Sequence, residues 1–589
     1  MLASVAISLL APAAALAAEP KAVIQGDLDK ALKAEIQRAI GVVKTHPESR
    51  VDARRRAREA SAAAIAVLRS EGYYDYQVEP DVGEGDHPDA VVRVTLGPRS
   101  MLAPARIVWD GAPPDAATIA VAEKALNLKP GAPGRAADVV AAEGRVAAML
   151  RDRGYADASV RPRRVVVDHQ SHTLQPTFSF AAGGLVHLDG VKVVGKTRTR
   201  PGWVGGLAGW KQGDVYSPAK VGQLERRLRD SGVFNSVTVA LAPPDENVAG
   251  LRPVVASLGD RPPHTIELGG GYSTSEGAGI DAKWSTYNLL GRADTLTLAG
   301  RLAQIQQKLD AELDLPDFGR PDQIFKVGGD LFADDTKAYN DDGLGVRANL
   351  ERHYTRTTFI ALGAAIDAVN TREKTAINPN GVAVGEKLNL VIFSTLAGFA
   401  LDRSNDPLNP TRGWRVSAEA DPTYVTGERT LPYLKLQGQA SGYLPLDADA
   451  NTVLAGRLKL GSIVGGSIPD VPADRRFFAG GGGSVRGFGY QKVGPQLADG
   501  TPLGGASLFE SSLEVRRHIT GPWGVVGFID AGSVGPTFTP DFHQVDVGAG
   551  VGVRYNLGFA PLRFDIATPV TRRKGDPWAE FYISIGQSF

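Results

Sequence analysis

A single arginine at the end of a glycine run is the residue in this chain with the clearest potential for chemistry. The run reads GGGGSVRGFGYQ over residues 480–491, with Val485, Arg486, Gly487 and Phe488 in its second half. Glycines let backbone amides approach an anion, which suggests a phosphate site. The run has neither of the two glycine spacings typical of nucleotide-binding loops, Gly-x-x-x-x-Gly-Lys-Ser/Thr and Gly-x-Gly-x-x-Gly. A partner for the guanidinium must therefore be sought elsewhere in the chain.

Two later segments carry carboxylates in a suitable alternation. In SLFESSLEVRRH (507–518), Glu510, Ser512 and Glu514 share one face, and Asp530 lies in the next apolar segment, VVGFIDAGSV. A guanidinium presents its donors in a fixed fork, so it can bridge two carboxylates where a lysine cannot. We predict that Arg486 pairs with Glu514 and Asp530 in a partly desolvated site, because an exposed pair contributes only about 0–1 kcal/mol.

The elements that would position these side chains have a period of two. From His264 onward, segments such as GWRVSAEAD and VDVGAGVGVRYN alternate apolar with polar residues or glycine, and turns of Gly, Pro, Asn and Asp separate them. A soluble β-sandwich alternates as well. Charges and glycines that gather on one face favour a membrane barrel, with lipid outside and water inside. At about 20 residues per strand and turn, residues 264–589 predict an antiparallel transmembrane β-barrel of about 16 strands.

The glycine run lies in an unusually long connection of this predicted barrel, between strands expected at Val453–Val464 and Ala506–Ile519. Connections of this length are usually functional or disordered. We predict that the loop folds into the lumen and that Arg486 fastens it to the wall. The other reading, a flexible surface loop whose arginine has no partner, leaves the two carboxylates unexplained.

Three α+β repeats precede the barrel. The segments LRSEGYYDYQV (68–78), LRDRGYADASV (150–160) and LRDSGVFNSVTV (228–239) each end a helical pattern at a glycine and continue as a strand. A period near 80 residues fits a small independent domain. The predicted domains span residues 22–98, 99–182 and 183–260, with first strands at Ala22–Gln25, Ala105–Trp109 and Val186–Val194. Chance similarity between unrelated segments is the other explanation.

Composition and the chain ends limit the function classes. The net charge is zero, which leaves no electrostatic footprint for nucleic acid, and the absence of cysteine excludes thiolate chemistry. The nine histidines are scattered and His-Glu-x-x-His is absent, so we expect no metal, no cofactor and no enzyme. Residues 1–18 read as a signal peptide with a small-x-small cleavage pattern.

The last residues, EFYISIGQSF, resemble the sorting signal of bacterial outer-membrane barrels. The residues expected on one face are Phe581, Ile583, Ile585 and Phe589, and Gln587 breaks the alternation.

These motifs together resemble the BamA/TamA/two-partner-secretion superfamily of outer-membrane insertases and transporters. The resemblance rests on Val-Arg-Gly-Phe in a late loop, Ser-Leu-Glu and Phe-Ile-Asp-Ala-Gly in the following strands, and LDRSNDPLNPTRGWR (401–415). It implies that the repeats are periplasmic POTRA modules and that Arg486, Glu514 and Asp530 hold the loop inside the barrel. Three repeats resemble the TamA branch, the translocation and assembly module subunit, more than the usual five of BamA.

The resemblance also implies a function. The chain would insert or translocate unfolded outer-membrane or autotransporter proteins, by strand addition at a weak barrel seam and at POTRA edges. A TamB-like partner anchored in the inner membrane and the lipid bilayer would be its other partners. Two alternatives stay open: a two-partner-secretion transporter or pore plugged by the loop, and a scaffold that only docks periplasmic proteins.

Overall fold

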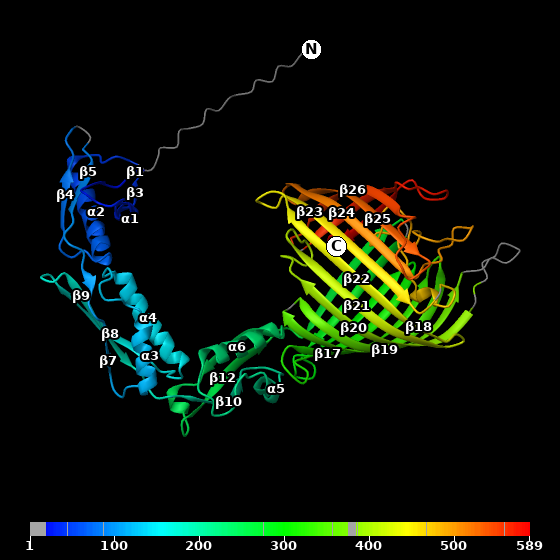
Figure 1. Ribbon diagram of the computed structural model, residues 1–589, viewed down its shortest axis with the longest axis horizontal. Helices are drawn as coiled ribbons and strands as arrows, with labels where there is room; N and C mark the ends of the chain where they lie inside the picture. Colours follow the sequence, from blue (N-terminus) through cyan, green and yellow to red (C-terminus); the bar gives the residue numbers. More distant parts are fainter. Residues whose placement is uncertain are drawn as a thin grey trace, which may run out of the picture. The chain divides into compact units, whose positions relative to one another are not determined.

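The computed structural model describes residues 19–43, 45–85, 88–274, 276–355, 357–374, 385, 387–466, 468–558 and 560–589 (Figure 1). The predicted signal peptide lies outside these residues. Contacts divide the chain into two compact units. One holds the described residues up to Lys192 with Ala208–Glu225 and Val239–Ala256, and the other holds Val193–Leu207, Arg226–Thr238 and Ser257–Phe589.

The first α/β module is a three-stranded sheet packed against two helices. Its strand order is β2 (Val23–Gln25), β5 (Ala90–Thr95), β4 (Gln77–Val82), and its helices are α1 (Lys30–Ile40) and α2 (Arg50–Ser70). A short pair, β1 (Glu19–Pro20) and β3 (Val42–Val43), lies beside them. Ala57, Ala60 and Ala64 recur on one face of α2 and are fully buried, since small residues at helical spacing let a helix approach a sheet closely.

Two further sheets follow the first module. In the second, β9 (Thr173–Ala181) pairs with β6 (Met101–Leu102), β7 (Arg106–Trp109) and β8 (Ser159–Asp168), and the helices are α3 (Ala116–Leu126) and α4 (Ala136–Asp152). The third has the order β10 (His187–Val194), β12 (Leu251–Asp260), β11 (Phe234–Leu241), with helices α5 (Pro201–Gly206) and α6 (Pro218–Asp230).

Glycines stop one helix in each module. Gly72, Gly154 and Gly232 follow α2, α4 and α6 at φ of 90°, 98° and 73°, a region that favours glycine because it has no Cβ. Their placement confirms the helix stops predicted from the three repeats. The strands β2, β7 and β10 each begin one residue later than predicted and end where predicted.

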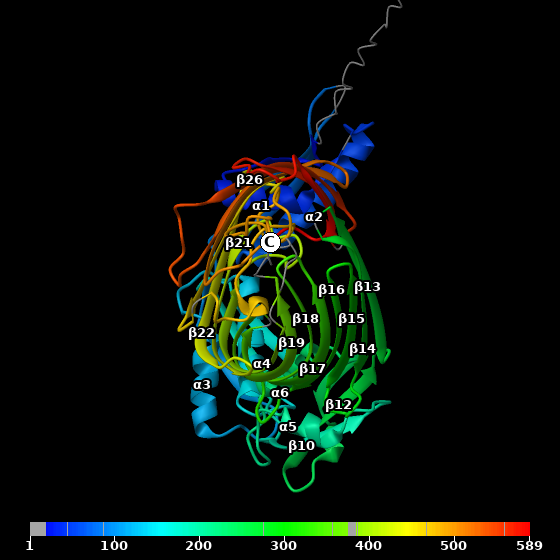
Figure 2. The same ribbon diagram turned by 90° about the vertical axis from the view of Figure 1, so that its right-hand side faces the viewer.

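Sixteen antiparallel strands form a closed barrel (Figure 2), which confirms the predicted fold class. In chain order they are β13 (His264–Ser273), β14 (Gly277–Tyr287), β15 (Thr295–Ala303), β16 (Gln306–Pro316), β17 (Gln323–Asp335), β18 (Tyr339–Thr355), β19 (Thr358–Glu373), β20 (Lys387–Asp402), β21 (Gly413–Gly427), β22 (Leu431–Pro445), β23 (Thr452–Val464), β24 (Ser507–Thr520), β25 (Trp523–Gly535), β26 (Asp546–Asn556), β27 (Pro561–Pro569) and β28 (Glu580–Ile585). Each strand pairs with its neighbour in sequence, and β28 meets β13.

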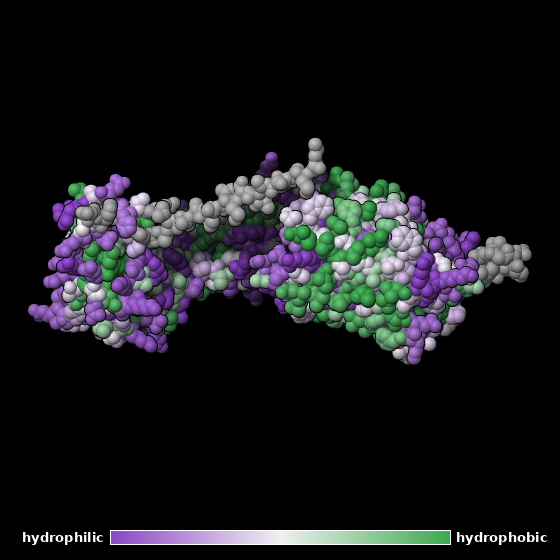
Figure 3. Space-filling model, turned by 90° about the horizontal axis from the view of Figure 1, so that it is seen from above, coloured by the Kyte–Doolittle hydropathy of each residue, from purple (hydrophilic) through white to green (hydrophobic). Residues whose placement is uncertain are grey.

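The outer face of the barrel is apolar. Side chains such as Leu309, Leu331 and Leu362 are more than half exposed. Figure 3 shows hydrophobic residues gathered over the outer surface of the barrel on the face in view. Alternate residues on the same strands point inward and are charged, for example Asp310 and Asp330. This arrangement matches the lipid-facing exterior and polar interior of a membrane barrel. None of the described helices combines the length and the apolar character needed to cross a membrane.

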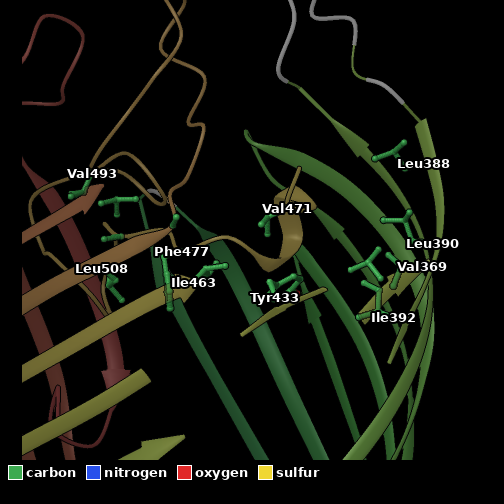
Figure 4. Close-up of a cluster of buried hydrophobic side chains, with 14 of the residues drawn as sticks. Val369, Leu388, Leu390, Ile392, Tyr433, Ile463, Val471, Phe477, Val493 and Leu508 are labelled. Atoms are coloured by element: carbon green, nitrogen blue, oxygen red, sulfur yellow. The ribbon is translucent and has the colours of Figure 1, made fainter. Parts of the chain in front are cut away.

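One part of the lumen has a hydrophobic core of its own. The connection between β23 and β24 packs Val471, Phe477 and Val493 against inward-facing wall residues that include Ile463 and Leu508 (Figure 4). Burying these side chains stabilises the loop in the lumen at roughly 25 cal/mol per Å² of apolar surface removed from water. The long connection therefore forms part of the folded barrel.

Candidate functional site

Arg486 lies among three carboxylates on the inner wall of the barrel. Its Nε and Nη2 donate to Asp530 at 2.6 and 2.9 Å, and Nη2 also lies 2.7 Å from Glu514. Its Nη1 lies 3.2 Å from Asp565, and the guanidinium carbon is 3.4 Å from the centre of the Phe528 ring. The structure thus brings the predicted trio together and adds Asp565 and Phe528, and we call this group the lumenal lock.

The lumenal lock is fully enclosed. The side chain of Arg486 is 1% exposed, and those of its three carboxylate partners are 0% exposed. A buried charge is costly unless it is paired and hydrogen-bonded, and here the fork of the guanidinium contacts all three acids. Removing one member of the cluster would strongly destabilise the barrel, because the remaining charges would stay buried without a partner. The intact cluster adds less net stability than this, since burying its ions costs free energy.

One glycine on β26, Gly548, makes room for the loop. An added Cβ at Gly548 would lie 1.9 Å from the carbonyl oxygen of Arg486, and Gly487 itself has a φ of 97°. Gly550 and Gly552 continue the same inward face of the strand, but an added Cβ there would meet wall atoms, at 2.3 Å from the carbonyl oxygen of Ile566 and 2.0 Å from Oδ1 of Asp565. The alternation in VDVGAGVGVRYN therefore has a second cause besides the lipid interface, which is close packing against the loop at Gly548 and against the neighbouring wall at the other two glycines.

The neighbours of Arg486 are also anchored. Val485 and Phe488 are 0% exposed and belong to the lumenal hydrophobic core, and the amide of Gly487 donates to the hydroxyl of Tyr582 on β28 at 3.1 Å. All six predicted residues of the lock are thus in or beside the cluster.

Sequence reasoning missed Asp565. It lies in PLRFDIATP, where Arg563, Asp565 and Ala567 alternate inward. The same alternation that selected Asp530 on β25 would have found it.

The seam between β13 and β28 is short. The strands pair only at Tyr272↔Ile583 and Ser273↔Tyr582, whereas the full length of β13 from His264 to Ser273 pairs with β14. A cavity of about 380 Å³ lies beside the seam, lined by both strands and by Gly482 of the lumenal loop. One edge of β13 therefore has unpaired backbone groups over most of its length.

The lumenal loop contacts both sides of the seam. The amide of Gly482 donates to Glu276 in the β13–β14 turn at 3.3 Å, and Gly487 reaches Tyr582 on β28. Thr274 also hydrogen-bonds Glu580 and the amide of Phe581 across the junction. Hydrogen bonds thus link the lumenal loop to the β13–β14 turn on one side of the seam and to β28 on the other.

The proposed C-terminal signal is placed only in part as expected. Phe581, Ile583 and Ile585 face outward and are 45%, 40% and 49% exposed. The prediction is wrong for Phe589, which lies in the lumen. Gly586 has a φ of 93°, so the chain turns inward before Phe589 and strand alternation no longer applies.

No site suited to a metal ion is present among the residues that the structure describes. The two histidines of the DHQSH turn, His169 and His172, lie with their Nδ1 atoms 2.5 and 3.1 Å from the carboxylate of Asp75. Their contacts belong to the packing between the first two modules.

Two family models match the chain. Residues 288–589 match the Omp85 superfamily domain, and residues 186–251 match the surface antigen variable number repeat, the POTRA family. The second match covers the third α/β module.

Two curated relatives share a name. The chain is 23% identical over 587 aligned residues to the outer membrane protein assembly factor BamA of Neisseria meningitidis, covering 88% of this chain and 71% of the relative. It is 22% identical to the BamA of Neorickettsia risticii, covering 66% of this chain and 53% of that relative. These names do not support the TamA branch that the repeat count predicted.

A solved structure shares the fold. The crystal structure of BamA from Haemophilus ducreyi lacking POTRA domains 1–3 superposes with a TM-score of 0.67 and 22% identity, over 82% of this chain and 99% of that one. The barrel lies in the outer membrane, with POTRA in the periplasm. Since the barrel model covers more than half of the chain, this protein belongs to the Omp85 superfamily.

Proposed function

We propose that this protein is an outer-membrane β-barrel assembly factor that accepts unfolded outer-membrane proteins at its seam and has no enzymatic step of its own. The observation that carries the proposal is the unpaired edge of β13. An exposed strand edge presents a row of N–H and C=O groups that can pair with another strand. The relatives named as assembly factors support the same reading.

The free edge is suited to strand addition. Ile266 and Leu268 point outward and are 71% and 79% exposed, and Gly269, Gly270 and Gly271 follow them. Glycines leave the backbone open to close approach by a second strand. An incoming strand would satisfy backbone groups that lipid cannot satisfy, which gives the exchange its driving force.

Two further kinds of partner extend this proposal. Autotransporters are among the substrates we propose, and a TamB-like partner would pair with an edge strand of the periplasmic modules. The edge strand β8 leaves one side unpaired in the second module's sheet and is a candidate for that contact.

A transporter or plugged pore is the second candidate, favoured by the loop that occupies the lumen. Conduction of a polypeptide through the lumen requires that loop to leave. Its departure would expose Val485 and Phe488 and separate Arg486 from three buried carboxylates. Since breaking one buried pair already costs about 3–5 kcal/mol, the seam route requires less disruption.

A disulfide across the seam tests the proposal. We expect the pair Tyr272→Cys and Ile583→Cys, which lie opposite each other on the outer face, to lower assembly of a reporter barrel at least tenfold under oxidation. Reduction should restore it, because the bond blocks only separation of the strands. The absence of native cysteine keeps other disulfides out of the experiment.

The matched control is Ile280→Cys with Leu302→Cys, an outward-facing pair on β14 and β15 away from the seam. It should form a disulfide without loss of assembly. Full activity of the oxidised seam variant would overturn the proposal and favour the lumenal route.

A further inference from the structure

The last three residues form a tail that enters the lumen. After Ile585 the amide of Gly586 donates to the carbonyl of Pro561 at 2.8 Å, and its positive φ turns the chain away from β28. The mark of the C-terminus lies within the outline of the barrel in both ribbon views (Figures 1 and 2). We refer to Gln587–Phe589 as the tail.

Phe589 occupies a built aromatic site on the inner wall. Its ring stacks on Tyr443 with centroids 6.4 Å apart and an interplanar angle of 25°. The guanidinium carbons of Arg516 and Arg457 lie 5.2 and 5.7 Å from its centre, and Nη2 of Arg516 donates to its main-chain oxygen at 3.3 Å. The side chains of both arginines are 7% exposed, which strengthens their attraction to the ring face. We call Tyr443, Arg457 and Arg516 the aromatic seat.

The other tail residues are bound by polar side chains. Nε2 of Gln587 donates to Asn409 at 3.0 Å, and its Oε1 accepts from Arg554 at 3.1 Å. Ser588 donates to Glu514, the same carboxylate that contacts Arg486. The polar residue that broke the expected strand alternation therefore contacts Arg554 on the inner wall and Asn409 in the β20–β21 connection. The tail also shares one acid with the lumenal lock.

The position of the tail leaves the β13 edge empty. If the seam register continued past Tyr272↔Ile583, Leu268 would face Gln587 and Ile266 would face Phe589. Ile266 points outward, so Phe589 would then join the apolar face of Phe581, Ile583 and Ile585. The same residues thus have two mutually exclusive places, one in the lumen and one on the strand edge.

We propose that the aromatic seat holds the tail in the lumen and that its occupant, Phe589, thereby keeps the tail off the β13 edge. Emptying the seat lets the tail straighten and pair with β13, which closes the edge to other strands. The seat therefore controls how much of the seam is available. This inference deepens the proposed function by adding a regulator of the same seam.

The test uses a reporter disulfide that forms only when the tail lies along β13. Leu268→Cys and Gln587→Cys are introduced together, and the cross-linked fraction is measured under mild oxidation in the full chain. The loss of the Gln587 side chain is common to all samples, so only differences between backgrounds are compared. We expect a low yield with the native seat and at least a fivefold rise with Tyr443→Ala or Phe589→Ala.

Three controls make the result specific. Tyr443→Phe keeps the ring that stacks on Phe589, so its cross-linked fraction should stay low. Tyr424→Ala removes an exposed tyrosine from the outer face, and its cross-linked fraction should also stay low. The Tyr272→Cys/Ile583→Cys pair reports a folded seam in every background.

A background-level yield in either Tyr443→Ala or Phe589→Ala, with the folded-seam control intact, would overturn the inference. So would an equal rise in Tyr424→Ala, because the cross-link would then report general loosening. Phe589→Ala leaves the wall unchanged, so it gives an answer even if Tyr443→Ala does not fold. The readout contains no substrate, so this inference and the proposed function can fail separately.

Discussion

Arg486→Ala is expected to lower the free energy of unfolding of the barrel by about 3–5 kcal/mol. The substitution leaves Glu514, Asp530 and Asp565 buried without their shared cation, and all three are 0% exposed. Arg486→Lys should recover only part of the loss, because one ammonium group cannot reproduce the fork that contacts three acids. Urea unfolding of the reconstituted protein, followed by the heat-dependent gel mobility of folded barrels, measures the change.

Arg517→Ala is the matched control for this prediction. Arg517 lies on β24, its side chain is 52% exposed, and it lies 3.4 Å from Asp447. Removing such an exposed pair should cost about 0–1 kcal/mol. Equal urea midpoints of unfolding for Arg486→Ala and Arg517→Ala would mean that the lumenal lock does not stabilise the barrel.

Gly548→Ala is expected to loosen the lumenal loop against the wall while leaving every charged group of the lock in the sequence. The added Cβ would lie 1.9 Å from the carbonyl oxygen of Arg486, a backbone atom that cannot turn aside as a side chain can. Overpacking that forces the backbone to shift costs typically about 1–3 kcal/mol. Limited digestion with trypsin should then cleave after Arg486 or Lys492, at least tenfold faster than in the parent chain.

Gly527→Ala provides the control for this second prediction. Gly527 lies on the neighbouring strand β25, and an added Cβ there meets nothing within 4 Å. Its digestion rate should match that of the parent. A Gly548→Ala variant that resists trypsin as well as Gly527→Ala would show that the wall tolerates a side chain under the loop.

The fold and the main charge contacts were predictable because they depend on local alternation. A strand places residues two apart on one face, so Glu514 and Asp530 could be assigned to the lumen once the barrel was inferred. The glycine helix stops were predictable for a similar reason, since Gly72, Gly154 and Gly232 each follow a helical pattern directly.

The seam and the position of Phe589 were not predictable in the same way. Pairing between β13 and β28 joins residues about 310 positions apart, and no local pattern states how many of them meet. Alternation predicted that Phe589 would face lipid, but one left-handed glycine, Gly586, and a remote pair of arginines determine its place instead. The role of the predicted residues in assembly remains a prediction for the experiments above.

The short seam, with only two residue pairs between β13 and β28, also has a consequence for how the barrel folds. The lumenal lock joins Arg486 to acids 28 to 79 residues later in the chain, whereas the seam must close a loop of more than 300 residues. Closing a longer loop costs more chain entropy, and contacts distant in sequence form slowly. We therefore expect the strands from β23 to β28 to form a hydrogen-bonded sheet first and the seam to close last. Before the seam closes, the first strand of the nascent barrel, β13, has an unpaired edge. Closure of the seam then adds β28 to that edge, which is the same kind of strand addition that we propose for substrates.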